Sequence, residues 1–230
     1  MTTLPLPSGP VPRILLIRHG QASFGAADYD ALSERGHAQA ALTVEALARQ
    51  GVRADRIVTG SLTRQRETAA PIGARLGASV DTDPRWNEYA IEALLAAHPP
   101  AAPPTLAAPP TPAAFQALLE SSLTAWIAAG AASPAPESYP AFRARTDAAL
   151  RDLAADLRAG QTAIVVSSGG VIAAVCATLL ELPTAGWLSL NRVAVNTAIT
   201  RLSSGRRGLS LLAFNEQSHL GPDPGLLTYR

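Results

Sequence analysis

The chain has 230 residues, of which 47% are hydrophobic and 16% charged, and its formal net charge is +1. This composition is typical of a globular protein and excludes an intrinsically disordered chain. The near-zero net charge gives no electrostatic basis for binding nucleic acid or an anionic membrane, so we expect neither partner. The single cysteine, Cys176, excludes an internal disulfide and lies in an apolar stretch that predicts a buried, inert thiol.

The first residues, "MTTLPLPSGPVPR", are rich in proline and lack both the basic start and the apolar centre of a secretion signal. Residues 1–12 therefore predict a disordered tail. No apolar run in the sequence reaches membrane-spanning length. We therefore expect a cytoplasmic protein.

The first third of the chain alternates short apolar runs with helical patterns. Strands are predicted at residues 13–17 and 55–60, helices within residues 31–51 and 61–77, and a third strand followed by a loop within residues 78–89. Ser33 and Ser61 are placed to cap the two helices, and Gly51 is placed to end the first one.

This alternation stops between residues 89 and 140, which we interpret as an insertion or cap. "AAHPPAAPPTLAAPPTPAA" is too rich in proline for a regular element, because proline lacks the backbone donor and breaks helices. The following "FQALLESSLTAWIAA" has a helical pattern. The insertion is therefore expected to be partly a mobile loop and partly a helical cap.

Strand and helix patterns resume after the insertion. A long helix is predicted at residues 139–159, a buried strand at 162–168, a helix opening on two glycines at 169–182, and a hairpin within 192–215. The sum predicts an α/β three-layer sandwich, with a mainly parallel sheet flanked by helices and a small helical and Pro-rich insertion. One domain is expected over residues 13–220, followed by a C-terminal tail at 221–230. The apolar hairpin faces make a homodimer possible.

Polar residues follow three of the predicted strands, where parallel sheets bind their ligands. Arg18 and His19 follow the first strand, and Arg64 lies in the first turn of the helix after the second. Ser168 and Gly169 introduce the helix after the strand at 162–168, at an N-terminus with exposed backbone donors. Arginine binds phosphate oxygens bidentately, and its charge lowers the pKa of a nearby histidine. The pattern predicts a phosphoryl site with a neutral, nucleophilic imidazole.

Each of these features also has an ordinary structural interpretation. Arg-His-Gly can follow a strand by chance, and Arg64 can be a solvated helix arginine like its neighbour Arg66. Glu88 can pair with Arg85, and a Gly-Gly pair often marks only a tight turn. The order and placement of all these features together favour the phosphoryl site.

The ordered set resembles the histidine phosphatase superfamily, the phosphoglycerate-mutase-like proteins, from Arg13 to about Leu220. "LIRHGQA" resembles the signature around the phosphorylated histidine, and "LSERGHAQA" the stretch after it. "TGSLTRQRETA" is similar to the segment with the second phosphate-binding arginine, "WNEY" to the place of the acidic proton donor, and "VVSSGGVI" to the last strand-to-helix turn. The resemblance implies a phosphoglycerate-mutase-like fold. We expect no metal and no cofactor, because the arginines neutralise the phosphoryl charge.

By this resemblance, His19 and Glu88 are the catalytic residues, and Arg18, Arg64, Ser168 and Gly169 bind phosphate. Ser168 departs from the family pattern, in which a second histidine stands at that position. Serine can donate a hydrogen bond but brings no positive charge, and losing one electrostatic contact typically costs about 10²–10³ in rate. None of His37, His98 and His219 is an obvious replacement.

The resulting function is a metal-independent phosphomonoester hydrolase that forms a phosphohistidine on His19, with reduced activity or altered specificity. Its expected partner is a phosphorylated small molecule. One alternative is a catalytically impaired phospholigand-binding or regulatory protein that retains the pocket. A phosphoglycerate mutase is a second alternative, disfavoured because residues 91–139 contain no arginine to clamp a phosphorylated glycerate.

Overall fold

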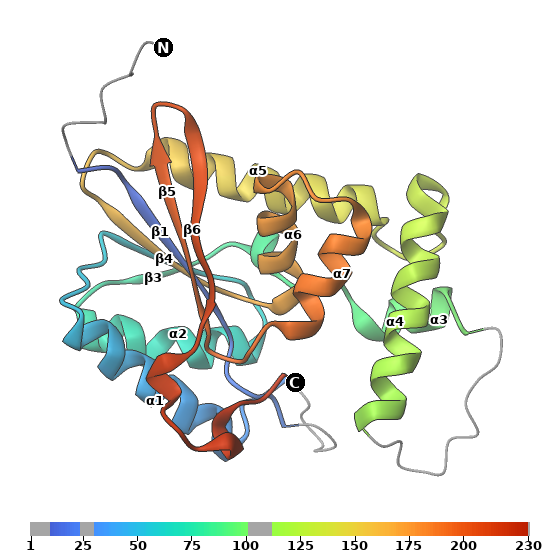
Figure 1. The fold of residues 1–230 in the computed structure, drawn as a ribbon, viewed down its shortest axis with the longest axis horizontal. Coiled ribbons are helices and arrows are strands. Elements are labelled where there is room, and N and C mark those ends of the chain that lie inside the picture. Colours follow the sequence, from blue (N-terminus) through green and yellow to red (C-terminus); the bar gives the residue numbers. More distant parts are fainter. Residues whose placement is uncertain (1–9, 24–29, 101–111, 230) are drawn as a thin grey trace.

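The computed structural model describes residues 10–23, 30–100 and 112–229 and contains a six-stranded sheet with the order β3-β2-β4-β1-β5-β6 (Figure 1). The strands are β1 (Arg13–Arg18), β2 (Arg56–Thr59), β3 (Val80–Thr82), β4 (Thr162–Ser167), β5 (Ile199–Gly205) and β6 (Gly208–Glu216). The first four run parallel, whereas β5 is antiparallel to both β1 and β6. The predicted mainly parallel sheet is confirmed, as is the hairpin, formed by β5 and β6.

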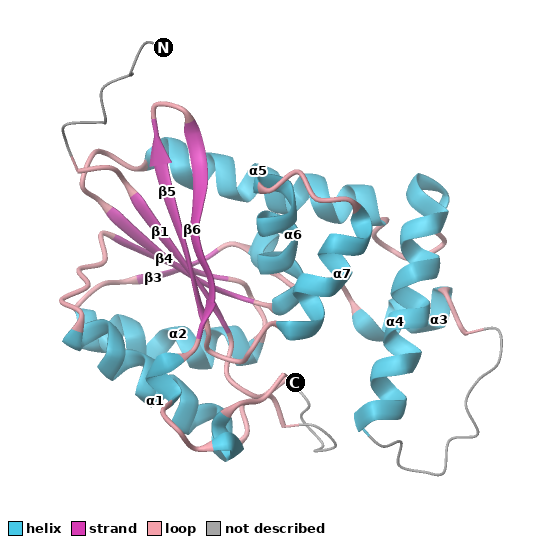
Figure 2. Cartoon of the chain, in the orientation of Figure 1, coloured by secondary structure: helices cyan, strands magenta, loops and turns pink. Residues whose placement is uncertain are grey.

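Helices cover both faces of the sheet (Figure 2). The helices on one face are α1 (Glu34–Arg49) and α2 (Thr63–Leu76), and those on the other are α5 (Tyr139–Asp156), α6 (Gly169–Leu179) and α7 (Thr184–Val193). The apolar residues of β1 alternate between the two cores, because successive side chains of a strand point to opposite faces. Leu15 and Ile17 pack toward α1 and α2, and Ile14 and Leu16 toward α5 and α6. The three-layer sandwich is confirmed.

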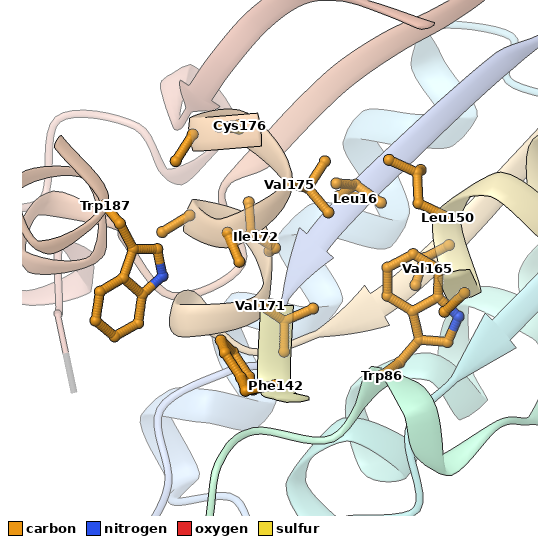
Figure 3. Close-up of a cluster of buried hydrophobic side chains, with 14 of the residues drawn as sticks. Leu16, Trp86, Phe142, Leu150, Val165, Val171, Ile172, Val175, Cys176 and Trp187 are labelled. Carbon is orange, nitrogen blue, oxygen red and sulfur yellow. The ribbon is translucent and has the colours of Figure 1, made fainter. Parts of the chain in front are cut away.

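The α6 face holds the larger core, shown in Figure 3. Trp86, Phe142 and Trp187 belong to the same core as the side chains of α6, and each is at most 1% exposed. The α6 residues from Gly169 to Ala177 are all buried, which explains why this helix is apolar on every side. Burial raises the pKa of the Cys176 thiol to about 12, so the predicted inert cysteine fits its surroundings.

One of the two predicted helix caps is correct. The Ser33 hydroxyl oxygen accepts a hydrogen bond from the Gly36 N–H at 3.1 Å, and α1 ends before Gly51, whose φ is +64°. The expectation for Ser61 is wrong, because α2 begins at Thr63 with Leu62 at the cap position. The free Thr63 N–H donates instead to the Asp30 carboxylate at 2.6 Å, so a residue distant in sequence caps this helix.

The predicted insertion contains two helices at one end of the molecule, beside α7 (Figure 1). They are α3 (Ile91–Ala97) and α4 (Pro112–Ala129), and α4 includes the predicted helix at residues 115–129. The sequence predicts no regular element in the Pro-rich stretch at residues 96–114, but α3 extends to Ala97 and α4 begins at Pro112, so this prediction is wrong at both ends of the stretch. Proline is tolerated in the first turn of a helix, where its missing N–H has no intrahelical partner. Residues 101–111 of the stretch, and residues 1–9 of the tail predicted at residues 1–12, lie outside the described residues. In the described part of the chain, no helix combines the length and apolar character that crossing a bilayer requires.

Candidate functional site

β1 and β4 are neighbours in the sheet, but the helices that follow them, α1 and α6, lie on opposite faces. Such a divergence opens a crevice at the carboxyl ends of the strands. His19 lies there, immediately after β1. Its backbone N–H donates to Ser167 O at 2.8 Å, and its carbonyl oxygen accepts from Asn196 Nδ2 at 2.9 Å. The topology therefore places this histidine at the switch point and holds its backbone on two sides.

Gly20 completes this turn because the chain has no space for a side chain here. A Cβ atom at this position would lie 2.5 Å from the carbonyl oxygen of Gly36, near the start of α1. The Gly20 N–H also donates to the Thr68 hydroxyl of α2 at 2.9 Å. The glycine thus lets α1 and α2 approach the histidine closely.

The hydrogen bonds of the His19 ring select one neutral tautomer. Nδ1 lies 2.7 Å from the Gly20 carbonyl oxygen, to which it must donate, while Arg64 Nε donates to Nε2 at 3.2 Å. Nε2 therefore carries a lone pair toward the arginine. Burial of the ring, followed by the charges of Arg64 and Arg18, lowers the pKa of His19 well below its usual value. The imidazole is neutral and its Nε2 can act as a nucleophile.

The Arg64 guanidinium is buried and, besides its contact with His19, is held by the carboxylate of Asp30. Its Nη1 donates to Asp30 Oδ1, while the other oxygen of the same carboxylate accepts from the Thr63 N–H. Asp30 therefore fixes both the start of α2 and the arginine in its first turn. The Arg18 guanidinium enters the site from the end of β1, and its Nη1 donates to the carbonyl oxygens of Ala194 and Tyr229.

Glu88 reaches the site from the chain that follows a 3-10 turn at Pro84–Trp86. Its Oε2 accepts a hydrogen bond from the Gly170 N–H at 2.8 Å, at the N-terminus of α6. Burial raises the pKa of Glu88, and this effect outweighs the opposing effects of Gly170 and of the two arginines, Arg64 and Arg18. Glu88 can therefore hold a proton at a higher pH than an exposed glutamate.

Two neighbouring features decide between interpretations of Glu88. Arg85 pairs with Asp83 and Asp152, so the alternative in which it pairs with Glu88 is wrong. A Cβ atom at Gly170 would lie 2.4 Å from Glu88 Oε1, so the second glycine of the Gly-Gly pair makes room for the carboxyl group. The pair is therefore part of helix α6 and of the site, and its role exceeds that of a tight turn.

A pocket brings together most of the residues that the sequence singled out. Arg18, His19, Arg64, Glu88 and Gly169 all line it. Ser168 does not line it: this serine is 1% exposed, and its Oγ accepts a hydrogen bond from Gln65 Nε2 at 2.9 Å. The direct phosphate contact predicted for Ser168 therefore stays a prediction.

Sequence reasoning missed two residues that support this site. Gln65 is completely buried, and its Nε2 also donates to Trp86 O at 3.1 Å, which links α2 to the chain before Glu88. Asp30 clamps Arg64 across 34 residues of sequence. Asp30 lies in no motif that the sequence singles out, and the motif that contains Gln65 was assigned a function only for Arg64. Gln65 follows Arg64 directly, so a polar residue on the same first turn was the available signal.

The other histidines lie elsewhere. His37 is exposed on α1, His98 Nε2 lies 2.8 Å from the Ser133 hydroxyl, and His219 Nε2 lies 3.2 Å from the Thr43 hydroxyl. None of them lines the pocket. Over residues 10–23, 30–100 and 112–229, no group of three or more His, Cys, Asp or Glu side chains is arranged to hold a metal ion.

Residues 14–217 match the sequence model of the histidine phosphatase superfamily (branch 1). The chain belongs to this superfamily. The resemblance drawn from the sequence motifs is therefore confirmed. No curated protein sequence matches the chain significantly.

Solved structures of phosphatases share this fold. A mycobacterial glucosyl-3-phosphoglycerate phosphatase is 26% identical, with a TM-score of 0.64, over 89% of this chain and 99% of that one. A phosphoserine phosphatase mutant from Entamoeba histolytica, in complex with phosphoserine, is 20% identical, with a TM-score of 0.67, over 91% and 99% of the two chains. The second likeness shows the fold alone. The superfamily and the mycobacterial neighbour support a phosphatase-type function for this chain.

Proposed function

We propose that the protein is a phosphomonoester hydrolase that acts through a phosphohistidine on His19 and takes a phosphorylated small molecule as substrate. The observation that carries this proposal is the state of the His19 ring. Nδ1 is bound to the Gly20 carbonyl oxygen, and Nε2 keeps a lone pair beside Arg64, in a pocket that Arg18 and Glu88 also line. A neutral imidazole ringed by guanidinium groups is what attack on a phosphoryl group requires.

The first half-reaction transfers the phosphoryl group to the enzyme. Arg18, Arg64 and the Gly169 N–H bind the phosphoryl oxygens. Arg64 Nε then donates its hydrogen bond to a phosphoryl oxygen and no longer to His19 Nε2. His19 Nε2 forms a bond to phosphorus in line with the ester oxygen as the phosphorus–oxygen ester bond breaks. Protonated Glu88 gives its proton to the departing oxygen, and the alcohol leaves.

The second half-reaction restores the enzyme. Glu88, now a carboxylate, takes a proton from water, and the water oxygen forms a bond to phosphorus. The bond between phosphorus and Nε2 breaks, its electron pair returns to the ring, and inorganic phosphate leaves. The arginine charges offset the charge on the equatorial oxygens throughout, so the steps assign no role to a metal ion.

A phospholigand-binding protein is the second candidate, and the position of Ser168 favours it. The second histidine of the family pattern is replaced by a hydroxyl that does not line the pocket, so the charge which that histidine would add to Arg18 and Arg64 is missing. Against it stands Glu88, because a protein that only binds has no need of a proton donor with a raised pKa.

The His19→Ala variant separates these candidates. We expect it to lose at least about a thousandfold of the wild-type rate on 4-nitrophenyl phosphate, since it removes the group that bonds to phosphorus. His37→Ala is the matched control, because it removes an exposed histidine outside the pocket and is expected to keep wild-type activity.

Mass spectrometry of enzyme quenched during turnover is the second measurement. We expect an acid-labile phosphoryl group on His19 in the wild-type protein and none in His19→Ala. A His19→Ala protein as active as wild type would overturn the proposal. Tight phosphate binding by the wild-type protein, without turnover or phosphohistidine, would establish the binding protein instead.

A further inference from the structure

The pocket continues beyond His19 into a cleft between the insertion and α7. The apolar side chains that line this part are Ile91 of α3, Phe115, Leu119 and Leu123 of α4, and Leu188 of α7. Leu119 and Leu123 are buried, and the other three are partly buried. We call these five residues the leaving-group wall, because they line the same pocket as Glu88, the proposed donor to the departing oxygen.

The charged residues in this part of the pocket are already paired. Apart from the groups around His19, the charged side chains that line it in the described chain are Glu120 of α4 and Arg192 of α7. They form a bidentate ion pair, in which Arg192 Nε donates to Glu120 Oε1 and Arg192 Nη2 donates to Glu120 Oε2, both at 2.8 Å. Gln116 also donates to Glu120. The arginine that could bind a substrate carboxylate is therefore occupied by the protein's own glutamate.

We propose that the substrate is the phosphate ester of an uncharged, mainly apolar alcohol, and that Glu120 discriminates against esters that carry a carboxylate. This inference rests on the proposed function. The wall contributes apolar area to the alcohol and no unpaired cation. A carboxylate that enters the cleft meets Glu120, which repels it, and must compete for Arg192 with that glutamate, which already holds the arginine by two hydrogen bonds.

Phosphonates test the wall without requiring turnover, because their carbon–phosphorus bond is not hydrolysed by the proposed steps. Binding of ethyl-, butyl- and hexylphosphonate to the full-length protein is measured by calorimetry. We expect the affinity to rise about fourfold for each methylene that leaves water, until the chain fills the cleft. A series with no dependence on chain length would overturn the inference.

A second pair of ligands tests the charge. Butylphosphonate and 3-phosphonopropionate have similar length, but the latter ends in a carboxylate, and we expect the wild-type protein to prefer butylphosphonate at least about tenfold. Glu120→Gln releases Arg192, so the affinity for 3-phosphonopropionate is expected to rise about threefold to fivefold. Glu92→Gln removes an exposed glutamate of α3 outside the pocket and is expected to leave the preference unchanged. Equal affinity of the wild-type protein for both ligands would overturn the inference.

Turnover of 4-nitrophenyl phosphate, measured on the same preparation, keeps the two proposals separate. A chain-length dependence without turnover supports the wall and contradicts the hydrolase. Turnover without a chain-length dependence, or with a preference for phosphoserine over butyl phosphate, supports the hydrolase and contradicts the wall.

Discussion

Glu88 has the environment that a proton donor requires, and its raised pKa predicts how the rate of the proposed reaction depends on pH. Because the pKa of Glu88 is raised, the protonated donor persists above the usual range of a glutamate and is lost as the pH rises through the raised value. In the proposed reaction His19 must be neutral, and its lowered pKa means that the neutral imidazole is lost only well below the usual histidine range. Activity on an alkyl phosphate should therefore fall at both ends of this window.

We expect Glu88→Gln to abolish the alkaline limb of the pH profile on butyl phosphate and to lower kcat about 10²–10⁴-fold. On 4-nitrophenyl phosphate the release of nitrophenolate in the first half-reaction should slow much less, since nitrophenolate leaves without taking a proton. The second half-reaction needs Glu88 as a base with either substrate, so the measurement is the rate of the first-turnover burst of alcohol or nitrophenolate from acid to alkaline pH, with Glu92→Gln as the control. Equal losses of the burst rate on both substrates would assign Glu88 a role in placing the phosphoryl group.

At the scale of the secondary-structure elements, helix α5 holds the chain segment that carries Glu88. Arg145 Nη1 donates to the carbonyl oxygens of Arg85 and Asn87, at 2.6 and 2.9 Å, while its guanidinium also pairs with Glu137. One cation thus satisfies two backbone acceptors on either side of Trp86 and fixes the approach of Glu88 to α6.

We expect Arg145→Met to lower the free energy of unfolding by about 2–3 kcal/mol, because it leaves two carbonyl oxygens and a carboxylate without this cation. The rate should fall as well, since Glu88 is less firmly placed. Arg151→Met on the same helix removes an exposed pair with Asp147 and should leave the denaturation midpoint unchanged. Equal shifts in urea denaturation for the two variants would show that Arg145 acts only as a surface charge.

Local patterns predicted these elements better than they predicted the contacts among them. The apolar run of β1 and the serine before α1 carry their structural signals within a few residues, and both predictions are correct. Helix α7 was missed because Pro183 and Gly186 at its start are residues typical of turns. The pattern instead predicts a hairpin from Arg192 onward, which is wrong at residues 192–193 because they end α7. The ion pair of Arg192 with Glu120 therefore went unpredicted.

The candidate site was predicted to the extent that parallel topology determines it. Strand order alone brings the ends of β1, β2 and β4 to one edge, so the proximity of His19 and Arg64 followed from the sequence pattern. The contact between Asp30 and Arg64 depends on how the chain before α1 lies against α2. No periodicity or cap signal specifies such a contact, because it forms between elements rather than within one.

The sheet as a unit buries His19, the proposed nucleophile, and this burial couples folding to pH. β1 lies inside the sheet between β4 and β5, and His19 at its end is only 6% exposed. In the unfolded chain, His19 takes up a proton near pH 6.5, whereas in the folded protein its lowered pKa keeps it neutral well below that pH. Between these two pKa values the unfolded state binds more protons, so stability falls as the pH falls.

The His19→Gln variant should remove this dependence. As the pH falls below 6.5, we expect the wild type to lose unfolding free energy relative to His19→Gln. The difference should change by at most about 1.36 kcal/mol per pH unit. The shift should end at the lowered pKa of His19. Glu88 acts in the opposite sense, because its raised pKa gives the folded state the extra proton, and His219 acts in the same sense as His19.

Both of these groups remain in the variant, so their contributions cancel in the difference to the extent that His19→Gln leaves their surroundings intact. Urea denaturation of the two proteins from pH 7 to pH 4 measures this difference in unfolding free energy. Parallel stability curves would mean that His19 is as easily protonated in the folded protein as in the unfolded chain. The imidazole would then be mostly a cation below pH 6.5, and its lone pair would be available to phosphorus only above that pH.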